Sequence, residues 1–424
     1  MSGKDTFMGG EDVGAIIFDI GSYMTKVGYG GEDCPRQVWP SVIGVNEEKK
    51  YYPLNFLSYR ENISVKPCYN IVNNDIQLNT QVFENIIEIS SGKYGLGILI
   101  NEHPILLTEQ TKHNRILREK EVEILFEKFD VPALYLAKRA VLNAFAVGRS
   151  SGLVVDIGAA FTSISPVIDG YTLQKCTFEY PIAGDFLDKQ ICKYLKQDKQ
   201  LDIIPNFAIK KTVYKDRAPI YNSVDLSNVH NSYINYGKKE VLRNIKESIC
   251  RCAENEELAK SNTSLATSTF ELPDGTLIDS EPIGIRVSEC LFNPEFAILD
   301  NSDNINNIKH NLDNYPGLCI AIANTVIASD IDIRRDLLGA VILTGGTSIL
   351  PGLTDRISRA LIEDDKLLGG PKLKVISPNT TNEKRFSSWI GASILASLGT
   401  FQQMWMSKQE YLEHGSHLVE RKCA

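Results

Sequence analysis

The fold of this chain is indicated by residues 14–30, which read GAIIFDIGSYMTKVGYG. An apolar run ends in Asp19, a short turn contains Gly21 and Ser22, and a second run of alternating character follows. This order is typical of a β-hairpin whose first strand is buried. The turn combines a carboxylate, a hydroxyl and a glycine that lets the backbone approach a ligand, and Lys26 follows on the returning strand. These groups are suited to holding a phosphate tail and its metal ion.

The pattern occurs a second time in residues 152–162, which read GLVVDIGAAFT and place Asp156 at the end of another apolar strand. A repeat of this kind indicates two related halves that face each other across a cleft. A third apolar strand, residues 340–343, runs into paired glycines whose backbone N–H groups can approach a phosphate or a nucleoside. Each of the first two loops alone is also compatible with an ordinary hairpin turn, because D-x-G is a common sequence, and the third with a plain strand-to-helix connection. Strand-rich units that alternate with helices indicate an α/β protein.

The length and composition narrow the class of protein. A chain of 424 residues is long for one core and predicts two domains. The formal net charge is -8 and no run of Lys and Arg is dense, so we expect no strong direct DNA binding. The nine cysteines contain no C-x-x-C pair, which indicates reduced thiols in an intracellular protein. No run approaches the roughly 20 apolar residues of a membrane span, so no membrane partner is expected.

Periodicity predicts the remaining elements. Helices are expected over residues 80–90, 119–129, 138–147, 181–195, 240–252 and 318–328, strands over 97–100 and 131–136, and a hairpin over 270–278. Residues 1–12 are small and polar and are expected to be disordered. Residues 45–75 are rich in Asn, Lys and Tyr without a clean period, and we expect an exposed insertion with little core of its own.

The order of the three loops resembles the arrangement of the actin and sugar-kinase superfamily, and the similarity to actins spans nearly the whole chain. The motifs that carry it are GEDCPR (31–36), EHP (102–104), AGD (183–185), ELPDG (271–275), DIDIR (330–334), WIGASILAS (389–397), TFQQMW (400–405) and SKQEY (407–411). Within actins, the chain resembles the nuclear actin-related protein 4 and actin-like protein 6 group. That resemblance rests on GGEDVGAIIFDIGS (9–22), DGYTLQ (169–174), and NTT (379–381) before RFSSW (385–389).

The resemblance implies an actin-like ATPase fold, in which two similar RNase H-like domains face a nucleotide cleft and comprise four subdomains. The small outer domain would contain residues 1–146 and 387–424, with 41–65 as a reduced second subdomain. The large inner domain would contain residues 147–386, with 183–299 as its fourth subdomain.

The resemblance also implies that the cleft binds ATP with Mg²⁺ or Ca²⁺. The implied nucleotide-binding residues are Asp19, Gly21, Ser22, Tyr23 and Lys26 in the first loop, Asp156, Gly158 and Thr162 in the second, Lys246 and Glu247 beside the nucleoside, Gly345, Gly346 and Thr347 in the third loop, and Arg385 near the adenine. Asp19 and Asp156 would face the metal ion indirectly, through water.

The residues that actins use for hydrolysis are replaced. Actins read DSGDGVTH where this chain reads DIGAAFTS, so Ala159 replaces a carboxylate and Ser163 a histidine. The glutamine that orients the attacking water in actins aligns with Arg139. Cleavage of a phosphate ester needs groups that position and deprotonate water. We therefore expect ATP binding with little or no hydrolysis and no catalytic residue, although an active ATPase and an empty pocket narrowed by Tyr23 and Phe161 are alternatives.

The resemblance implies a nuclear subunit of chromatin-remodelling and histone-acetyltransferase complexes that pairs with actin on a helical segment of a scaffold protein. Contact with nucleosomes or histones is a further possibility. Residues 45–65 differ from the loop with which actins grip the next subunit, so no homopolymer is expected, and a filament-forming divergent actin is the alternative.

A groove for a helical partner is also implied. The positions that match the lining of the actin groove are Phe145, Gly148, Gly170, Tyr171, Leu395, Thr400 and Met404. An apolar groove suits an amphipathic helix, but any single one of these side chains is equally compatible with an ordinary core.

Overall fold

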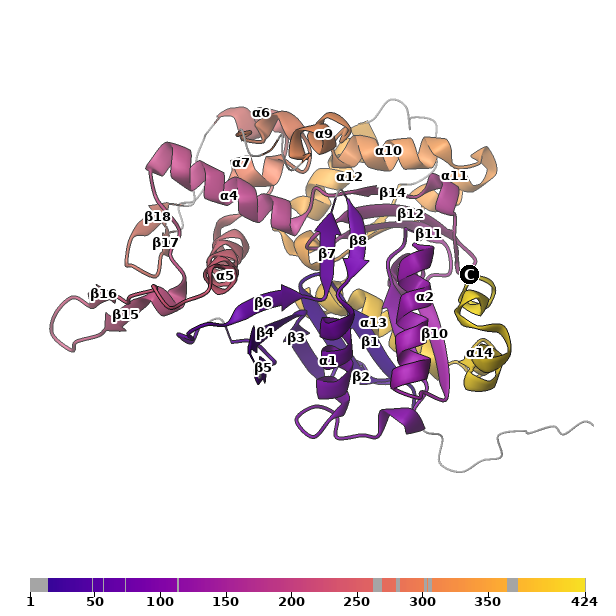
Figure 1. Cartoon of the computed structure of the whole chain (residues 1–424). Helices are drawn as coiled ribbons and strands as arrows, with labels where there is room; N and C mark the ends of the chain where they lie inside the picture. The colour runs from indigo at the N-terminus through magenta and orange to yellow at the C-terminus, as the bar shows by residue number, and fades with distance from the viewer. Residues whose placement is uncertain are drawn as a thin grey trace, which may run out of the picture.

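The structure, a computed structural model, describes residues 14–423 except 48, 56, 73, 113, 262–268, 280–282, 301–302, 304–306 and 364–372. Residues 1–12, expected to be disordered, lie outside the described residues. Two large β-sheets form the framework, one in the lower half of Figure 1 and the other above it, and helices pack around both. The arrangement confirms the predicted α/β class.

The first sheet is built around the predicted hairpin. Its strands, in spatial order, are β21 (Met406–Ser407), β10 (Ala133–Lys138), β9 (Ile105–Glu109), β1 (Ile16–Ile20), β2 (Met24–Tyr29) and β3 (Gln37–Pro40). Strand β1 pairs antiparallel with β2 and parallel with β9, so it has a neighbour at both edges and is buried along its length. A strand in that position is a continuous apolar run, which explains why the local pattern predicted it.

The second sheet repeats this plan. The order is β13 (Tyr171–Thr172), β12 (Thr162–Ile168), β11 (Gly152–Ile157), β19 (Val341–Thr344) and β20 (Val375–Ile376), and β14 (Phe178–Tyr180) also pairs with β12. Strand β11 is antiparallel to β12 and parallel to β19, as β1 is to β2 and β9. The repeated sequence pattern therefore corresponds to a repeated topology.

Helices connect and cover the sheets. They are α1 (Thr80–Ser91), α2 (Arg115–Glu123, continued by a π-helical turn, Ile124–Lys128), α3 (Arg139–Ala146), α4 (Gly184–Lys199), α5 (Asn231–Ile249), α6 (Glu256–Ser261), α7 (Ile283–Glu289), α9 (Ile308–Asp313), α10 (Leu318–Ala328), α11 (Ile331–Leu338), α12 (Leu353–Glu363), α13 (Thr381–Ser397), α14 (Lys408–His414) and α15 (Val419–Lys422). Helices α3 and α13 pack so closely that a Cβ at Gly391 would lie 1.8 Å from the carbonyl oxygen of Leu142.

Residues 45–75 form regular strands, although the sequence predicted an irregular, exposed insertion with little core of its own. They contribute to a three-stranded sheet of β4 (Val42–Asn46), β5 (Lys49–Tyr51) and β6 (Ser64–Pro67), and to a hairpin of β7 (Tyr69–Val72) and β8 (Asp75–Leu78). Leu54 and Ile63 are each 2% exposed and share a hydrophobic cluster with Tyr233 of α5. The segment therefore has little core of its own, as predicted, because a distant helix completes the cluster. The strands were missed because they leave no clean local period.

Hydrogen bonds join the same segment to α5, which lies beside β6 (Figure 1). The Tyr233 hydroxyl donates to the carbonyl oxygens of Asn55 at 2.8 Å and Ser58 at 2.6 Å. The backbone N–H of Val65 donates to the Ser232 hydroxyl at 2.8 Å. We call these contacts and the cluster of Leu54 and Ile63 the α5 bridge.

The prediction of a buried strand at residues 97–100 is also wrong. Leu99 is 64% exposed, and a 3₁₀ turn covers Ile100–Glu102. The strand that enters the first sheet is β9, which follows Pro104. The apolar run at 97–100 instead packs only in part against the core, through Ile98 and Ile100.

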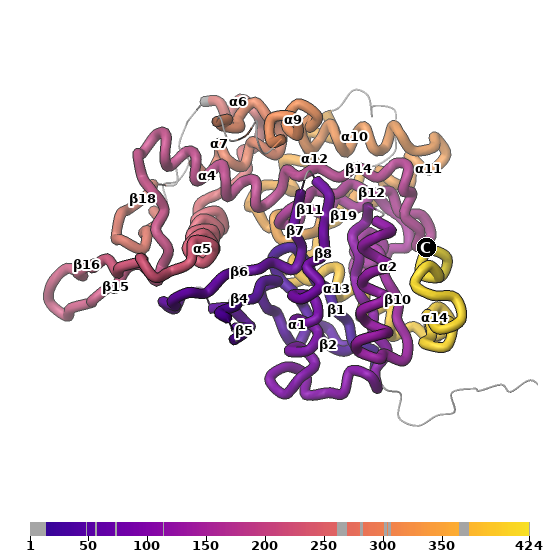
Figure 2. The backbone as a smooth tube through the Cα atoms, in the orientation of Figure 1, coloured from indigo at the N-terminus to yellow at the C-terminus, as the bar shows by residue number. Residues whose placement is uncertain are grey.

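Other predicted turns and elements are confirmed. Asp169 and Gly170 both have positive φ, at 49° and 81°, as a type I′ turn requires. The hairpin at 270–278 forms as β17 (Thr269–Glu271) and β18 (Leu277–Asp279). A further hairpin, β15 (Ile209–Thr212) with β16 (Ile220–Ser223), projects from the left of the molecule in Figure 2.

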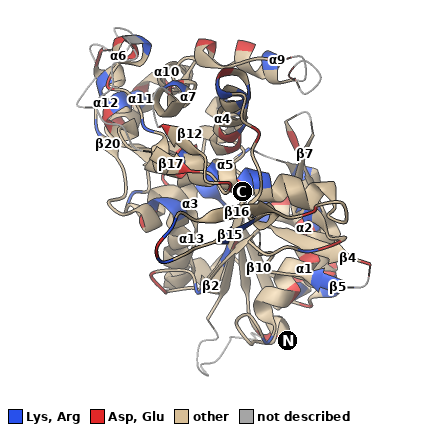
Figure 3. Ribbon diagram, turned by 90° about the vertical axis from the view of Figure 1, so that its left-hand side faces the viewer, with Lys and Arg blue, Asp and Glu red and all other residues tan. Residues whose placement is uncertain are grey.

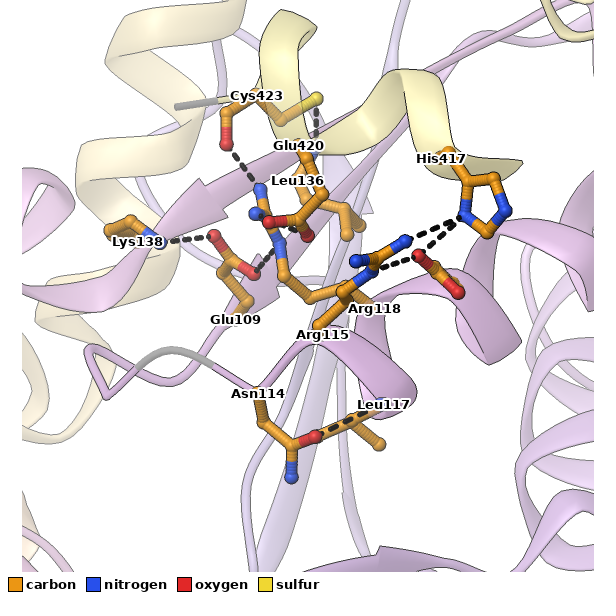
Figure 4. A network of polar contacts seen from close by, with 11 residues as sticks. Glu109, Asn114, Arg115, Leu117, Arg118, Leu136, Lys138, His417, Glu420 and Cys423 are labelled. Carbon is orange, nitrogen blue, oxygen red and sulfur yellow. Dashed lines mark hydrogen bonds and ion pairs between the residues drawn. The ribbon is translucent and has the colours of Figure 1, made fainter. Parts of the chain in front are cut away.

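A buried ionic network fastens the last helices to the first sheet (Figure 4). The carboxylate of Glu109, at the end of β9, forms ion pairs with Lys138 Nζ at 3.0 Å and with Arg118 Nε at 2.8 Å. Arg118 also pairs with Glu420 at 2.9 Å and donates to the carbonyl oxygen of Cys423. Buried charges of this kind persist when every partner is present, so the network fixes the end of β9.

Charged residues of both signs are scattered over the ribbon in Figure 3, which agrees with the absence of dense basic runs in the sequence. Among the described residues, no helix combines the length and the apolar character that crossing a membrane requires.

Candidate functional site

The first turn is arranged around one buried carboxylate. Asp19 is 2% exposed at the end of β1, directly opposite Lys26 in the β1–β2 register. The Lys26 ammonium donates to Asp19 Oδ2 at 2.8 Å, and the Thr108 hydroxyl donates to Asp19 Oδ1 at 2.7 Å. A Cβ at Gly21 would lie 2.9 Å from the carbonyl oxygen of Met24, so this tight turn depends on a glycine. The sequence placed Asp19, Gly21 and Lys26 together, and the structure does the same.

Arg139 adds a second cation to the same carboxylate. It is the first residue of α3, and its Nε lies 3.2 Å from Asp19 Oδ1 while its Nη2 donates to the carbonyl oxygen of Ile20 at 2.7 Å. Burial alone would raise the pKa of Asp19, but Lys26 and Arg139 hold that pKa well below its usual range. Asp19 is therefore ionised at physiological pH, and both of its oxygens are engaged by protein donors.

The second turn has a different environment. Asp156 is the penultimate residue of β11, and burial raises its pKa, although Arg139 opposes that rise by attraction. Gly345 of the third loop has a φ of +94°, and a Cβ there would lie 2.5 Å from Asp156 Oδ1. The paired glycines therefore let the third loop pack directly against this carboxylate. A Cβ at Gly346 would meet no atom within 4 Å, so the backbone beside Gly345 borders open space.

The second turn, the third loop and α5 meet at the start of α4. The Thr347 hydroxyl donates to the carbonyl oxygen of Gly158 at 2.7 Å. The Lys246 ammonium donates to the carbonyl oxygen of Gly184 at 2.8 Å and pairs with Asp188 at 2.8 Å. Residues from four separate segments are thus held at one point, as the resemblance implies for Gly158, Lys246 and Thr347.

Three other residues of the second turn and its returning strand have different surroundings. The Thr162 side chain is fully buried and its hydroxyl donates to the carbonyl oxygen of Ile182 at 2.7 Å, so it supports the sheet beneath the turn. Ser163 is opposite Asp156 in the β11–β12 register. The backbone carbonyl of Ala159 accepts from the N–H of Asp185 at 2.7 Å.

Tyr23 connects the first turn to α5. Its hydroxyl donates to Glu240 Oε2 at 3.0 Å, and the Arg243 guanidinium lies 3.4 Å from the centre of its ring. Burial raises the pKa of Tyr23 to about 12, so the phenol stays protonated. Arg243 also pairs with Asp185 at 3.1 Å. Sequence reasoning missed Glu240 and Arg243, since the only signal was an ordinary i, i+3 charge pair on a helix.

Two residues expected beside the nucleoside form an ion pair. Arg385 of α13 donates to Glu247 Oε2 of α5 at 2.9 Å, and both side chains are about half exposed. The backbone N–H of Gly345 donates to the carbonyl oxygen of Lys384 at 3.3 Å, which brings the third loop to the same place. Ser22, in the first turn, is half-buried.

The positions implied for a helical partner fall at the ends of α3 and α13 and in the β12–β13 turn. A Cβ at Gly170 would lie 3.3 Å from the Phe145 ring, so these two residues adjoin. Tyr171 and Met404 are 60% and 40% exposed, whereas Leu395 packs against a buried cluster. Gly148, with a φ of +69°, and Thr400 are exposed.

The donor set favours a phosphate over a directly ligated metal ion. Among the described residues, no group of three or more His, Cys, Asp or Glu side chains is placed to hold a metal ion. Both Asp19 oxygens are already engaged. Lys26, Arg139 and the glycine-rich third loop are instead the kind of groups that bind phosphate oxygens.

Comparison with known proteins agrees with this arrangement. The model of the family described as Actin matches residues 10–424, and the chain belongs to the actin family. Within it, the chain is similar to proteins named actin-related protein 4. It is 35% identical to the one from Arabidopsis thaliana, with 98% of this chain and 99% of the relative covered. The identity is 36% to that of Oryza sativa subsp. indica, with 98% and 99% covered, and 33% to that of Yarrowia lipolytica, with 98% and 97% covered.

Proposed function

We propose that this chain is a nuclear actin-related protein that binds ATP with little or no hydrolysis, does not polymerise, and serves as a structural and regulatory subunit of chromatin-remodelling and histone-acetyltransferase complexes. Membership of the actin family and similarity to actin-related protein 4 over nearly the full length support this proposal. The proposed lack of hydrolysis rests on one observation, the hydrogen bonds that Arg139 donates to Asp19 and to the carbonyl oxygen of Ile20 in the first turn.

ATP binding is supported by the fit of the three loops to a polyphosphate. Lys26 lies beside the first turn with its side chain 15% exposed. The backbone at Gly346 borders open space, and the lack of a Cβ at Gly345 lets the third loop lie against Asp156. Mg²⁺ or Ca²⁺, when bound with the nucleotide, would supply positive charge to the phosphates, and this chain's carboxylates would contact it only through water.

The lack of hydrolysis follows from the groups that surround the second turn. A water attacking a phosphate must be oriented and must lose a proton to an acceptor. Ala159 presents a methyl group, and Arg139 has only donors, two of which are already directed at Asp19 and Ile20. The proposal therefore assigns no catalytic residue to this chain.

The absence of filaments is supported by the α5 bridge. In the proposal, residues 41–65 cannot grip a neighbouring subunit because Asn55, Ser58 and Val65 are bonded to α5 of their own chain. The proposed partners are actin, which is a second chain of the same fold, and a helix of a scaffold protein. The exposed Tyr171 and Met404 support the helix-binding surface. Nucleosomes or histones remain further candidate partners, and no strong direct DNA contact is proposed.

Affinity purification of the tagged protein from a nuclear fraction tests the proposal. Actin and a helical scaffold subunit of a remodeller or acetyltransferase should elute with it, and acid extraction of the eluate should release ATP rather than ADP. Steady turnover of ATP by the pure chain at the rate of actin would instead establish an active ATPase. A pellet after sedimentation in polymerising salt would establish a filament-forming protein.

A further inference from the structure

Two carboxylates near the ends of the central strands, the buried Asp19 and the partly buried Asp156, require a compensating positive charge. Asp19 and Asp156 repel each other, since the charge of Asp19 raises the pKa of Asp156. In proteins such a pair is commonly neutralised by a bound cation or by a basic side chain. Here Arg139 attracts both carboxylates and contacts Asp19 at 3.2 Å. The guanidinium is therefore held at Asp19, where it supplies positive charge to the first turn.

The geometry holds Arg139 in that position. The Nε group faces Asp19 Oδ1 and the Nη2 group donates to the carbonyl oxygen of Ile20 at 2.7 Å, so two separate atoms of β1 orient one planar group. Within the described part of the chain, this guanidinium contacts other groups through Nε and Nη2. The Nη1 group can therefore donate to a phosphate oxygen, for which a planar guanidinium is well shaped.

The same contacts weaken the case for a metal ion bound by the protein. A cation that ligated Asp19 would have to compete with Thr108 and with the positive charges of Lys26 and Arg139, all of which already contact this carboxylate. A divalent ion placed next to a permanently charged guanidinium is also repelled by it.

We propose that Arg139 acts as a built-in cation at the phosphate end of the site, so that this chain binds ATP with little dependence on Mg²⁺ or Ca²⁺. The inference rests on the proposed function, because it concerns how the proposed ATP is held. In this proposal Arg139 determines whether ATP binds with or without a metal ion, and it is therefore a specificity-determining residue. The metal-free polyphosphate becomes an adequate ligand, since the protein supplies the charge that a metal ion otherwise brings.

The test compares ATP affinity with and without divalent ions. The full-length chain is freed of nucleotide, and ATP binding is measured by calorimetry in Mg²⁺, in Ca²⁺ and in EDTA. For the unaltered chain we expect the three dissociation constants to agree within about threefold, a difference of less than 1 kcal/mol. An affinity at least about tenfold tighter with Mg²⁺ than with EDTA would overturn the inference and leave the proposed ATP binding intact. Failure to bind ATP under every condition would overturn the proposed function itself.

Variants of Arg139 sharpen the result. Arg139→Gln removes the charge and should bind ATP at least about tenfold more weakly in EDTA than in Mg²⁺. Arg139→Lys keeps the charge and should remain close to the unaltered chain. Arg149→Gln, which removes an exposed charge just beyond α3, is the matched control and should leave the metal dependence unchanged. Equal metal dependence of Arg139→Gln and Arg149→Gln would contradict the assignment, and the measurement on the unaltered chain decides the matter if either variant fails to fold.

Discussion

The turns after β1 and after β11 hold equivalent places in their sheets, yet their carboxylates have different environments. Asp19 faces Lys26 across the hairpin, whereas Asp156 faces Ser163 at the same place in its register. The pKa of Asp19 lies well below its usual range because Lys26 and Arg139 outweigh its burial, and burial raises the pKa of Asp156. A repeated topology thus sets where the carboxylate lies, and one residue on the returning strand decides whether it has its own counter-ion.

The two carboxylates therefore receive their neutralising positive charge from different sources. Lys26 neutralises Asp19 within the first hairpin, and Asp156 depends on Arg139 from outside its own sheet. A single, partly buried cation therefore acts on both carboxylates, which couples the two turns electrostatically. Four substitutions test this difference, and they are described in order of decreasing expected effect.

Asp19→Asn should be the most damaging change. The substitution leaves the positive charges of Lys26 and Arg139 without their counter-ion. Removal of one partner from a buried ion pair lowers the free energy of unfolding by about 3–5 kcal/mol. Asp156→Asn should cost about 1 kcal/mol or less without nucleotide, because burial already penalises that charge. Urea unfolding of both variants measures the difference, and equal losses would show that the two turns are equivalent after all.

Gly345→Ala should destabilise the second turn by about 2–3 kcal/mol. Its Cβ would lie 2.5 Å from Asp156 Oδ1, and its φ of +94° strains any residue with a side chain. Gly346→Ala is the matched control, since its Cβ would enter open space. Thermal unfolding compares them, and a similar melting temperature for both would mean that the third loop does not press on Asp156.

Lys26→Ser gives the first turn the residue that stands at the equivalent place in the second. The variant loses one of the two cations at Asp19 and keeps Arg139, so we expect a loss of about 2 kcal/mol in the free energy of unfolding. Urea unfolding measures the loss, and ATP affinity should fall as well. No change in either property would show that Arg139 alone neutralises Asp19.

A pH experiment extends the comparison to a third carboxylate. Burial raises the pKa of Glu121 to about 8, and the phenol of Tyr69, which donates to it at 3.0 Å, only partly opposes that rise. Between pH 4.5 and 8 the folded chain then binds more protons than the unfolded chain, so stability falls as pH rises. Glu121→Gln should flatten that fall by about 1 kcal/mol per pH unit.

The matched control is Glu123→Gln on the same helix, where the side chain is 37% exposed. It should leave the slope of stability against pH unchanged. The free energy of unfolding is measured at intervals from pH 5 to pH 8. An unaltered slope in Glu121→Gln would show that burial does not hold a proton on this carboxylate.

Local patterns predicted the two hairpins because β1 and β11 are central strands whose burial produces continuous apolar runs. They also predicted that Asp19 and Lys26 would meet, since both belong to one hairpin. Contacts between distant segments had no local signal. Leu54 packs on α5, and Arg139 turns toward Asp19 rather than toward the second turn, and both outcomes depend on how separate elements are assembled.

The α5 bridge has a kinetic consequence. Residues 41–65 can move away from α5 only when the bonds from Tyr233 to Asn55 and Ser58 and from Val65 to Ser232 part together and Leu54 and Ile63 lose their cover. The segment should therefore open as one unit. The amide hydrogen of Val65 would then exchange with solvent at the rate of that opening.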